Sequence, residues 1–112
     1  MPLDPRVWLS DVLEAGQLAQ QFAAGLTFEQ YEADLLRRSA VERQLTILGE
    51  AVVQLANLTP SVTFSVPGMI GFRNFLIHRY ARVDQTIVWA VLRDDVPVLL
   101  TEAQQFLQQL GS

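Results

Sequence analysis

The sequence predicts an all-α protein, an up-and-down bundle of four to five helices that residues 1–112 form as a single domain. Apolar residues recur at spacings of three and four along several segments, as they do on one face of a helix. Residues typical of helix starts precede these segments. The chain has 112 residues and 50% of them are hydrophobic, which suffices for one core and excludes a second.

The first helix is expected between Asp4 and Gly25. Asp4 suits the N-cap and Pro5 the first helical position, while Leu3 is placed to pack on Trp8 as a hydrophobic staple. Gly25 favours a helix end. One apolar stripe connects the two ends: Trp8, Val12, Ala15, Ala19 and Phe22.

A second helical region starts at Thr27, because Thr27 and Gln30 match a capping box. It ends within residues 57–60. A break between a short helix, residues 28–33, and a longer one stays open. Its apolar face is wide and consists of Leu36, Ala40, Val41, Leu45, Ile47, Leu48, Ala51, Val52 and Leu55.

Residues 61–66 alternate as a short strand would, but no second strand is predicted to pair with them, so we interpret the segment as a loop. Pro67 then suits the first turn of a helix that runs to His78 or Tyr80. The apolar positions of this helix are Met69, Ile70, Phe72 and Leu76.

The last helical region is expected to start at Asp84, another N-cap residue. Pro97 should kink or split it, because proline has no backbone N–H to donate. Asp94 and Asp95 lie where a new N-cap would fall, so two abutting helices and one bent helix both fit. The apolar stripe comprises Val88, Leu92, Val96, Leu99, Ala103, Phe106 and Leu110.

The wide apolar faces leave two interpretations open. They provide surface for a partner, with a homodimer as the simplest case, or they form the thick core of a monomer. The start of the chain lacks the basic and apolar segments of a signal peptide, and no apolar run is long enough to cross a membrane. We therefore expect a cytoplasmic protein that does not contact membranes.

The counts of cysteine and histidine limit the kinds of catalytic and metal sites that the chain can form. The absence of cysteine excludes disulfides, cysteine-bound zinc and thiol nucleophiles. The one histidine, His78, excludes a multi-histidine metal site within one protomer. We expect neither a metal nor another cofactor.

Charge is unevenly distributed along the chain. The net charge is −4, from 12 acidic and 8 basic residues, but residues 51–83 contain no acid and hold Arg73, Arg79, Arg82 and His78. This segregation predicts a local positive site, suited to a phosphate group, on an acidic body. It argues against a protein that coats nucleic acid with its whole surface.

Arg73 and His78 are the main candidate site residues. On one helix they would point ~140° apart, since each residue turns by ~100°. They converge only if the helix ends between them, or if a second copy supplies its own pair across a dimer cleft. The two residue types suit metal-free cleavage of RNA, whose 2′-hydroxyl is a built-in nucleophile: a histidine transfers the proton, and an arginine holds the phosphate.

A purely structural interpretation stands beside this one. In it, His78 caps the C-terminal end of its helix and Arg73 pairs with an acid such as Glu50. Gly49, next to Glu50, permits two helices to approach closely. Glu50 is therefore also a candidate to support the site by bonding Arg73 or Asn74 from the neighbouring helix.

Four separated blocks carry a resemblance that covers nearly the whole chain. They are Ala40-Val-Glu-Arg, Ile47-Leu-Gly-Glu-Ala51, Ile70-Gly-Phe-Arg-Asn74, and Val83-Asp followed by Ile87-Val-Trp89. The third block continues to His78 and Tyr80, which matches an Arg-x4-His-x-Tyr signature. In these features the sequence resembles the HepT-like proteins of the HEPN superfamily.

The resemblance implies a dimerising HEPN-like bundle and a metal-independent endoribonuclease, the toxin of a type II- or VII-like toxin–antitoxin system. Arg73 and His78 would be its catalytic pair. The implied partner is an antitoxin of the minimal nucleotidyltransferase (MntA) type. This partner would adenylylate Tyr80, which places phosphates in the positive cleft and blocks RNA.

Three further residues are expected to assist, each with a structural alternative. Asn74 lies one turn before His78 and is placed to orient it, or satisfies backbone groups at the helix end. Arg79 and Arg82 would extend phosphate binding, or are simply solvated. The sequence departs from the family pattern at 67–68, where proline and glycine replace an aromatic and polar helix start, so the position of that start is open.

A second class of function also fits the sequence. The chain would then be a non-catalytic helical binding subunit that positions or receives a nucleotidyl group from a partner nucleotidyltransferase. The acidic overall charge favours this alternative slightly. Expression of the chain alone distinguishes the two, because only the ribonuclease would be toxic.

Overall fold

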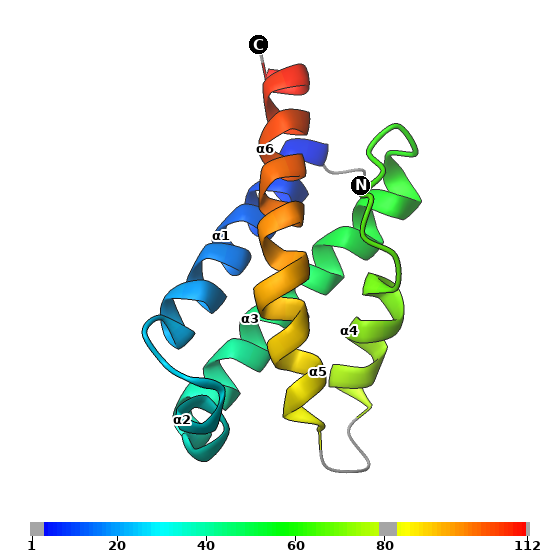
Figure 1. The fold of residues 1–112 in the computed structure, drawn as a ribbon. Coiled ribbons are helices and arrows are strands. Elements are labelled where there is room, and N and C mark those ends of the chain that lie inside the picture. The colour runs from blue at the N-terminus through cyan, green and yellow to red at the C-terminus, as the bar shows by residue number, and fades with distance from the viewer. Residues whose placement is uncertain (1–3, 79–82, 112) are drawn as a thin grey trace.

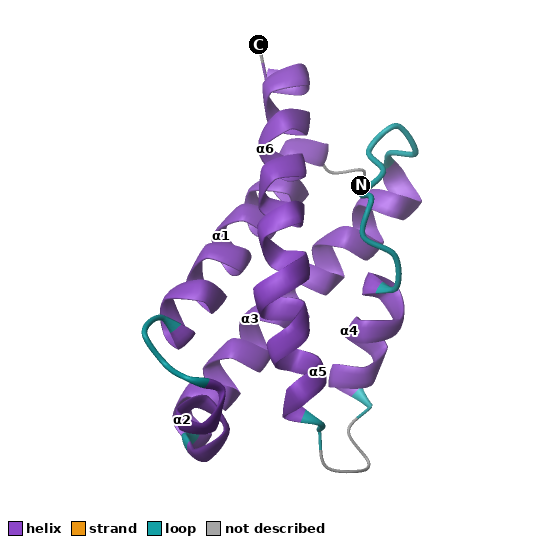
Figure 2. Cartoon of the chain, viewed as in Figure 1, coloured by secondary structure: helices purple, strands orange, loops and turns teal. Residues whose placement is uncertain are grey.

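A computed structural model, which describes residues 4–78 and 83–111, confirms the all-α class (Figure 1). All regular structure in these ranges is helical (Figure 2). None of these helices is long and apolar enough to cross a membrane. The elements are α1 (Pro5–Ala23), α2 (Phe28–Ala33), α3 (Leu35–Leu58), α4 (Met69–Ile77), α5 (Gln85–Ala90), the π-helical segment η1 (Val91–Asp95) and α6 (Val96–Gly111).

The predicted helix starts are confirmed at three positions. The carboxylate of Asp4 accepts a hydrogen bond from the backbone of Arg6, and Asp84 does the same for Thr86. Thr27 and Gln30 form both bonds of the capping box. The predicted staple by Leu3 lies outside the described residues.

The open question of a break after residue 33 is settled by Asp34. Its backbone is extended, and its carboxylate accepts from the backbone N–H of Arg37 at 3.0 Å. Asp34 therefore ends α2 and caps α3, so the region contains two helices.

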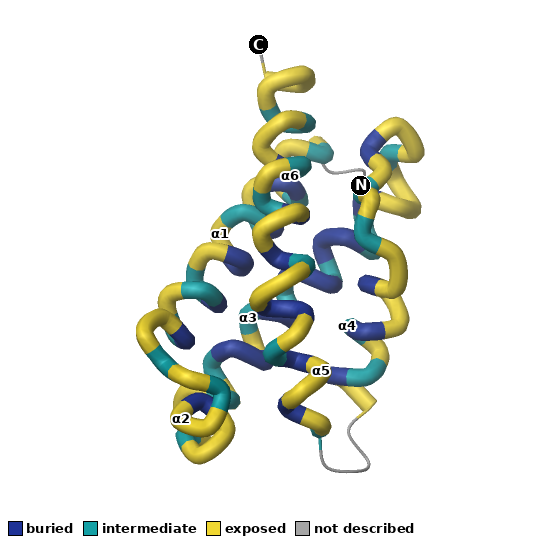
Figure 3. The backbone as a smooth tube through the Cα atoms, in the orientation of Figure 1, coloured by how far each residue is buried: buried dark blue, intermediate teal, exposed yellow. Residues whose placement is uncertain are grey.

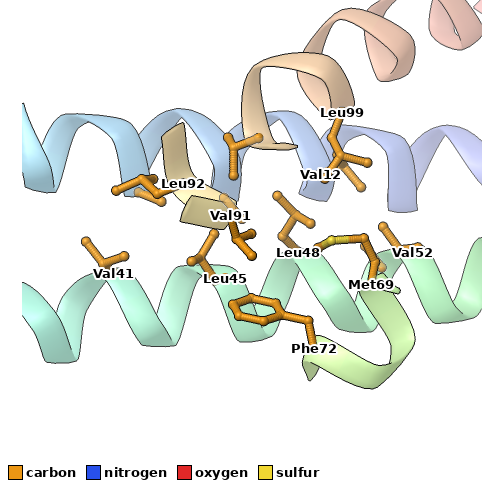
Figure 4. Packing of buried hydrophobic residues seen from close by; sticks show 14 of the residues in the cluster. Val12, Val41, Leu45, Leu48, Val52, Met69, Phe72, Val91, Leu92 and Leu99 are labelled. Atoms are coloured by element: carbon orange, nitrogen blue, oxygen red, sulfur yellow. The ribbon is translucent and has the colours of Figure 1, made fainter. Parts of the chain in front are cut away.

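The core lies between α3 and the helices on either side of it. On one side α3 packs against α1, which also packs against α6, and Val12 and Leu99 lie there; on the other side α3 packs against α4, where Phe72 lies (Figure 4). Most residues of the predicted stripes are buried or half-buried, but Leu36, Ile70 and Leu110 are exposed, so their assignment to the apolar faces was wrong. The outer faces of α1, α4 and α6 are exposed (Figure 3). Fully buried side chains include Leu9, Val12, Tyr31, Val41, Leu45, Leu48, Leu55, Val88, Val96 and Leu99.

Pro97 neither splits the last helical region nor creates a new cap at Asp94 or Asp95. The chain stays helical from α5 through η1 into α6, and the N–H of Val96 donates to the carbonyl of Val91, five residues earlier. A π-turn is wider than an α-turn, so it accommodates the proline ring and the missing N–H without ending the helix. Of the two arrangements that the sequence left open, the single continuous helix is the one observed.

The start of α4 also differs from the prediction. Pro67 lies in a turn before the helix, and α4 begins at Met69 with Gly68 as its N-cap. Gly68 has φ of 81°, a left-handed conformation that glycine adopts at little cost. Residues 61–66 form a loop, as predicted, and the N–H of Ser65 ties it to the carboxylate of Glu102 on α6.

Candidate active site

Arg73 of α4 packs closely on α3 at Gly49. A Cβ atom added to Gly49 would lie 2.8 Å from the Cβ and 2.9 Å from the Cγ of Arg73. Real Cβ atoms do not approach this closely, so the contact requires glycine. The prediction that Gly49 permits close helix approach is confirmed.

Gly49→Ala should therefore destabilise the protein relative to Gly71→Ala. Both substitutions replace a glycine within a helix, but a Cβ at Gly71 meets nothing within 4 Å. Both variants gain helix propensity, so the difference between their unfolding free energies isolates the cost of the clash. This cost should be about 1–3 kcal/mol. Denaturant unfolding of both variants measures it, and equal stabilities would contradict the close approach.

The guanidinium of Arg73 forms an ion pair with Glu50 of α3, through its Nη1 and the carboxylate Oε1. The side chain of Arg73 is 20% exposed and that of Glu50 is 41% exposed. The Nε of Arg73 is buried without a hydrogen-bond partner in the described part of the chain. Both the structural interpretation and the supporting role of Glu50 predicted this contact.

This ion pair reduces the positive charge that was expected for residues 51–83. Residues 51–83 contain no acid, yet Glu50, directly before them, neutralises part of the charge on Arg73. Charge counted along the sequence does not reveal which side chains meet across two helices. The local field at the site is therefore weaker than the sequence alone indicates.

His78 is the residue at which α4 ends. Its backbone leaves the helical region, with φ of −95° and ψ of 56°, and its N–H donates to the carbonyl of Asn74 at 2.9 Å. The helix thus continues from Arg73 up to the residue before His78, so the convergence of the two residues across a dimer cleft stays a prediction. Both His78 and the Asn74 side chain are exposed. Arg79, Tyr80 and Arg82 lie outside the described residues.

A buried polar network was missed by the sequence analysis. The hydroxyl of Tyr31 donates to the Oε1 of Gln85 at 2.8 Å, and the Nε2 of Gln85 donates to the carboxylate of Glu42 at 2.7 Å. Burial, and then the nearby Glu42 carboxylate, raise the pKa of Tyr31, so its hydroxyl keeps the proton that it donates.

The network joins α2, α5 and α3, and so fixes the start of α5 against the other two helices. A signal for it was present in the sequence. Glu42 lies between Val41 and Leu45, on the apolar side of the long helix, where a carboxylate needs a buried partner.

Within the described ranges, no three side chains of histidine, aspartate or glutamate gather as a metal site would need. The site is instead an exposed histidine at a helix end with an arginine on the same helix, within an all-α bundle. This combination agrees with what the resemblance to HepT-like proteins implies. The family model "Ribonuclease HepT-like" matches residues 12–106, and the chain belongs to this HepT-like ribonuclease family.

Relatives of similar length support this assignment. The chain is 33% identical to "Probable ribonuclease HepT" of Thermococcus cleftensis, over 82% of this chain and 86% of that protein. It is 31% identical to a "Putative RNase" of Methanocaldococcus jannaschii, over 90% of this chain and 94% of that protein. A "Putative RNase" of Caldanaerobacter subterraneus is 30% identical over 94% and 96%. No solved structure matches the chain.

Proposed function

We propose that this protein is a metal-independent endoribonuclease toxin, which acts in the cytoplasm as a homodimer and cleaves RNA with Arg73 and His78. The observation that carries the proposal is the position of His78. It ends α4 as an exposed residue, five positions after Arg73, in a chain of the HepT-like ribonuclease family.

The chemistry needs one proton acceptor, one proton donor and a group that stabilises charge. A histidine base removes the proton of the RNA 2′-hydroxyl, whose oxygen then attacks the adjacent phosphorus. The 5′-oxygen of the next nucleotide leaves with a proton, and a 2′,3′-cyclic phosphate remains. Two copies of His78 in a dimer cleft supply both the acid and the base, and Arg73 stabilises the negative charge of the transition state.

The proposal is tested with purified protein and single-stranded RNA in EDTA. Cleavage should persist without divalent metal and rise with the concentration of dimer. If RNA stays intact under all metal conditions, the ribonuclease function is wrong.

The second candidate is a non-catalytic binding subunit that partners a nucleotidyltransferase. The ion pair between Arg73 and Glu50 favours it, because a neutralised guanidinium attracts phosphate less strongly. Expression of the chain alone separates the candidates. Growth arrest supports the toxin, whereas normal growth together with a stable complex with the nucleotidyltransferase supports the binding subunit.

We further propose that a minimal nucleotidyltransferase of the MntA type is the antitoxin and adenylylates Tyr80. Tyr80 follows His78 by two residues. An added nucleotide would bring negative phosphates next to Arg73 and the neighbouring arginines and would occupy space that RNA needs.

Co-expression with the nucleotidyltransferase should increase the intact mass by whole adenylyl units, located at Tyr80 by peptide mapping. Tyr80→Phe should retain ribonuclease activity, show no mass increase and escape neutralisation. An unchanged mass with the toxin still silenced would instead mean that a stable complex inhibits it.

A further inference from the structure

A surface pocket of about 270 Å³ lies between α3 and α4, beside the residue that precedes His78. We call it the α3–α4 pocket. One wall consists of Leu76 and Ile77 at the end of α4. The full lining is Ser39, Glu42, Arg43, Thr46, Leu76 and Ile77.

The polar wall of the pocket continues to the candidate active site. Ser39, Arg43, Thr46 and Glu50 follow one another at spacings of four, three and four, and therefore share one face of α3. Glu50 holds Arg73 at one end of this face, and the pocket lies at the other. The pocket and the ion pair therefore lie along one face of α3.

Arg43 is the residue of this face that can hold an anion. It is exposed, and it makes no ion pair with any residue in the described ranges. Arg73, by contrast, is paired with Glu50. A guanidinium without a carboxylate partner keeps its full charge and its planar fork for phosphate oxygens.

Two other polar side chains of the lining, Glu42 and Thr46, already make hydrogen bonds within the protein. Glu42 is buried and accepts from Gln85, and the hydroxyl of Thr46 donates to the backbone carbonyl of Glu42 at 2.8 Å. The aliphatic side chains of Leu76 and Ile77 offer an apolar surface for the flat face of a base. The volume is just below the ~300–1,000 Å³ of pockets that enclose drug-sized ligands, so it suits a single nucleotide.

We propose that the α3–α4 pocket binds one nucleotide of the RNA substrate next to the cleaved phosphodiester, with Arg43 in contact with its phosphate. This inference rests on the proposed ribonuclease function and adds a substrate-binding residue to it. Arg43 takes no part in proton transfer. It determines how the strand enters the site.

The test measures binding of a labelled single-stranded RNA by fluorescence anisotropy, across a series of salt concentrations, in a His78→Ala background that prevents cleavage. Arg43→Gln should weaken binding about 5- to 10-fold and lower the salt slope by about one, because one phosphate contact is lost. Arg93→Gln is the matched control. It removes the same charge from an exposed arginine that packs on Trp89, in a different pocket, and should leave the slope unchanged.

A third variant distinguishes the pocket from the charge alone. Ser39→Leu adds bulk to the pocket without a change of charge, so it should weaken binding while the salt slope stays the same. Thermal unfolding of each variant verifies that all are folded at the temperature of the assay.

Equal slopes for Arg43→Gln and Arg93→Gln would overturn the phosphate contact, and unchanged affinity in Ser39→Leu would overturn the pocket. A shift of the monomer–dimer equilibrium in these variants, with RNA affinity unchanged, would show that the pocket is an interface between two copies. If the His78→Ala protein does not bind RNA and the wild-type protein does not cleave it, the proposed ribonuclease function is itself wrong. Cleavage by the wild type with unaltered binding in the variants refutes only the pocket.

Discussion

His78→Ala should lower the rate of RNA cleavage at least about 100-fold and leave the fold intact. Proton transfer by a positioned side chain contributes ~10²–10⁴-fold to such reactions, and this chain has no second histidine to replace it. The His78 side chain is exposed at the end of α4, and the backbone N–H of this residue donates to the carbonyl of Asn74, a bond that alanine retains. Single-turnover cleavage and thermal unfolding, measured on the same preparation, test both parts.

Chemical rescue separates catalysis by His78 from a role in ending the helix. In His78→Gly, added imidazole should restore part of the cleavage rate, because the free base can occupy the vacated space and transfer the proton. A helix-ending role would not respond to imidazole. Cleavage at the wild-type rate in His78→Ala would exclude this residue from the mechanism.

Much of the fold is encoded in short segments, and these were predictable. Asp4, Thr27 and Asp84 each bond a backbone N–H two or three residues ahead, so the sequence next to them is sufficient to identify the helix start. The start at Asp34 stayed open, because the helices before and after it have similar apolar patterns. Local capping geometry decided it.

Two features that the sequence left open have tertiary causes. Pro97 was expected to kink or split the last helical region. Val96 and Leu99, on either side of it, are fully buried, and their packing stabilises a continuous helix in which a π-turn accommodates the proline. Gly68 is the N-cap of α4, since the path of the chain into the helix needs a left-handed residue at this position. No local pattern marks either outcome.

The roles of Arg73 and His78 stay predictions, whereas the contact of Glu50 with Arg73 was predicted and is observed. The Arg73 and His78 positions follow from the motif, and Gly49 from its place beside Glu50. The network of Tyr31, Gln85 and Glu42 joins residues up to 54 positions apart, and such contacts arise only once the helices are packed. Arg43 was missed for the same reason. Its availability for a phosphate depends on the absence of a carboxylate partner in the described ranges, which becomes known only once the helices are packed.

Arg73→Ala should lower the cleavage rate about 10²- to 10³-fold, the usual loss when one donor that stabilises transition-state charge is removed. The stability effect should be smaller, about 1–2 kcal/mol, because the lost ion pair is partly exposed and the lost aliphatic stem accounts for the rest. Arg73→Lys is the sharper variant. It keeps the charge but loses the planar fork, so it should recover little of the rate.

Glu50→Gln distinguishes a catalytic Arg73 from one that only stabilises the fold. The amide keeps the shape of the side chain and removes the negative charge beside the guanidinium. If Glu50 orients Arg73 for catalysis, RNA should bind more tightly, since a repelling carboxylate is gone, while turnover falls because the guanidinium is less well fixed. If the pair is structural, Glu50→Gln and Arg73→Ala should both alter the unfolding midpoint and leave the turnover of the folded enzyme unchanged. The second pattern would remove Arg73 from the active site and assign transition-state stabilisation to another donor.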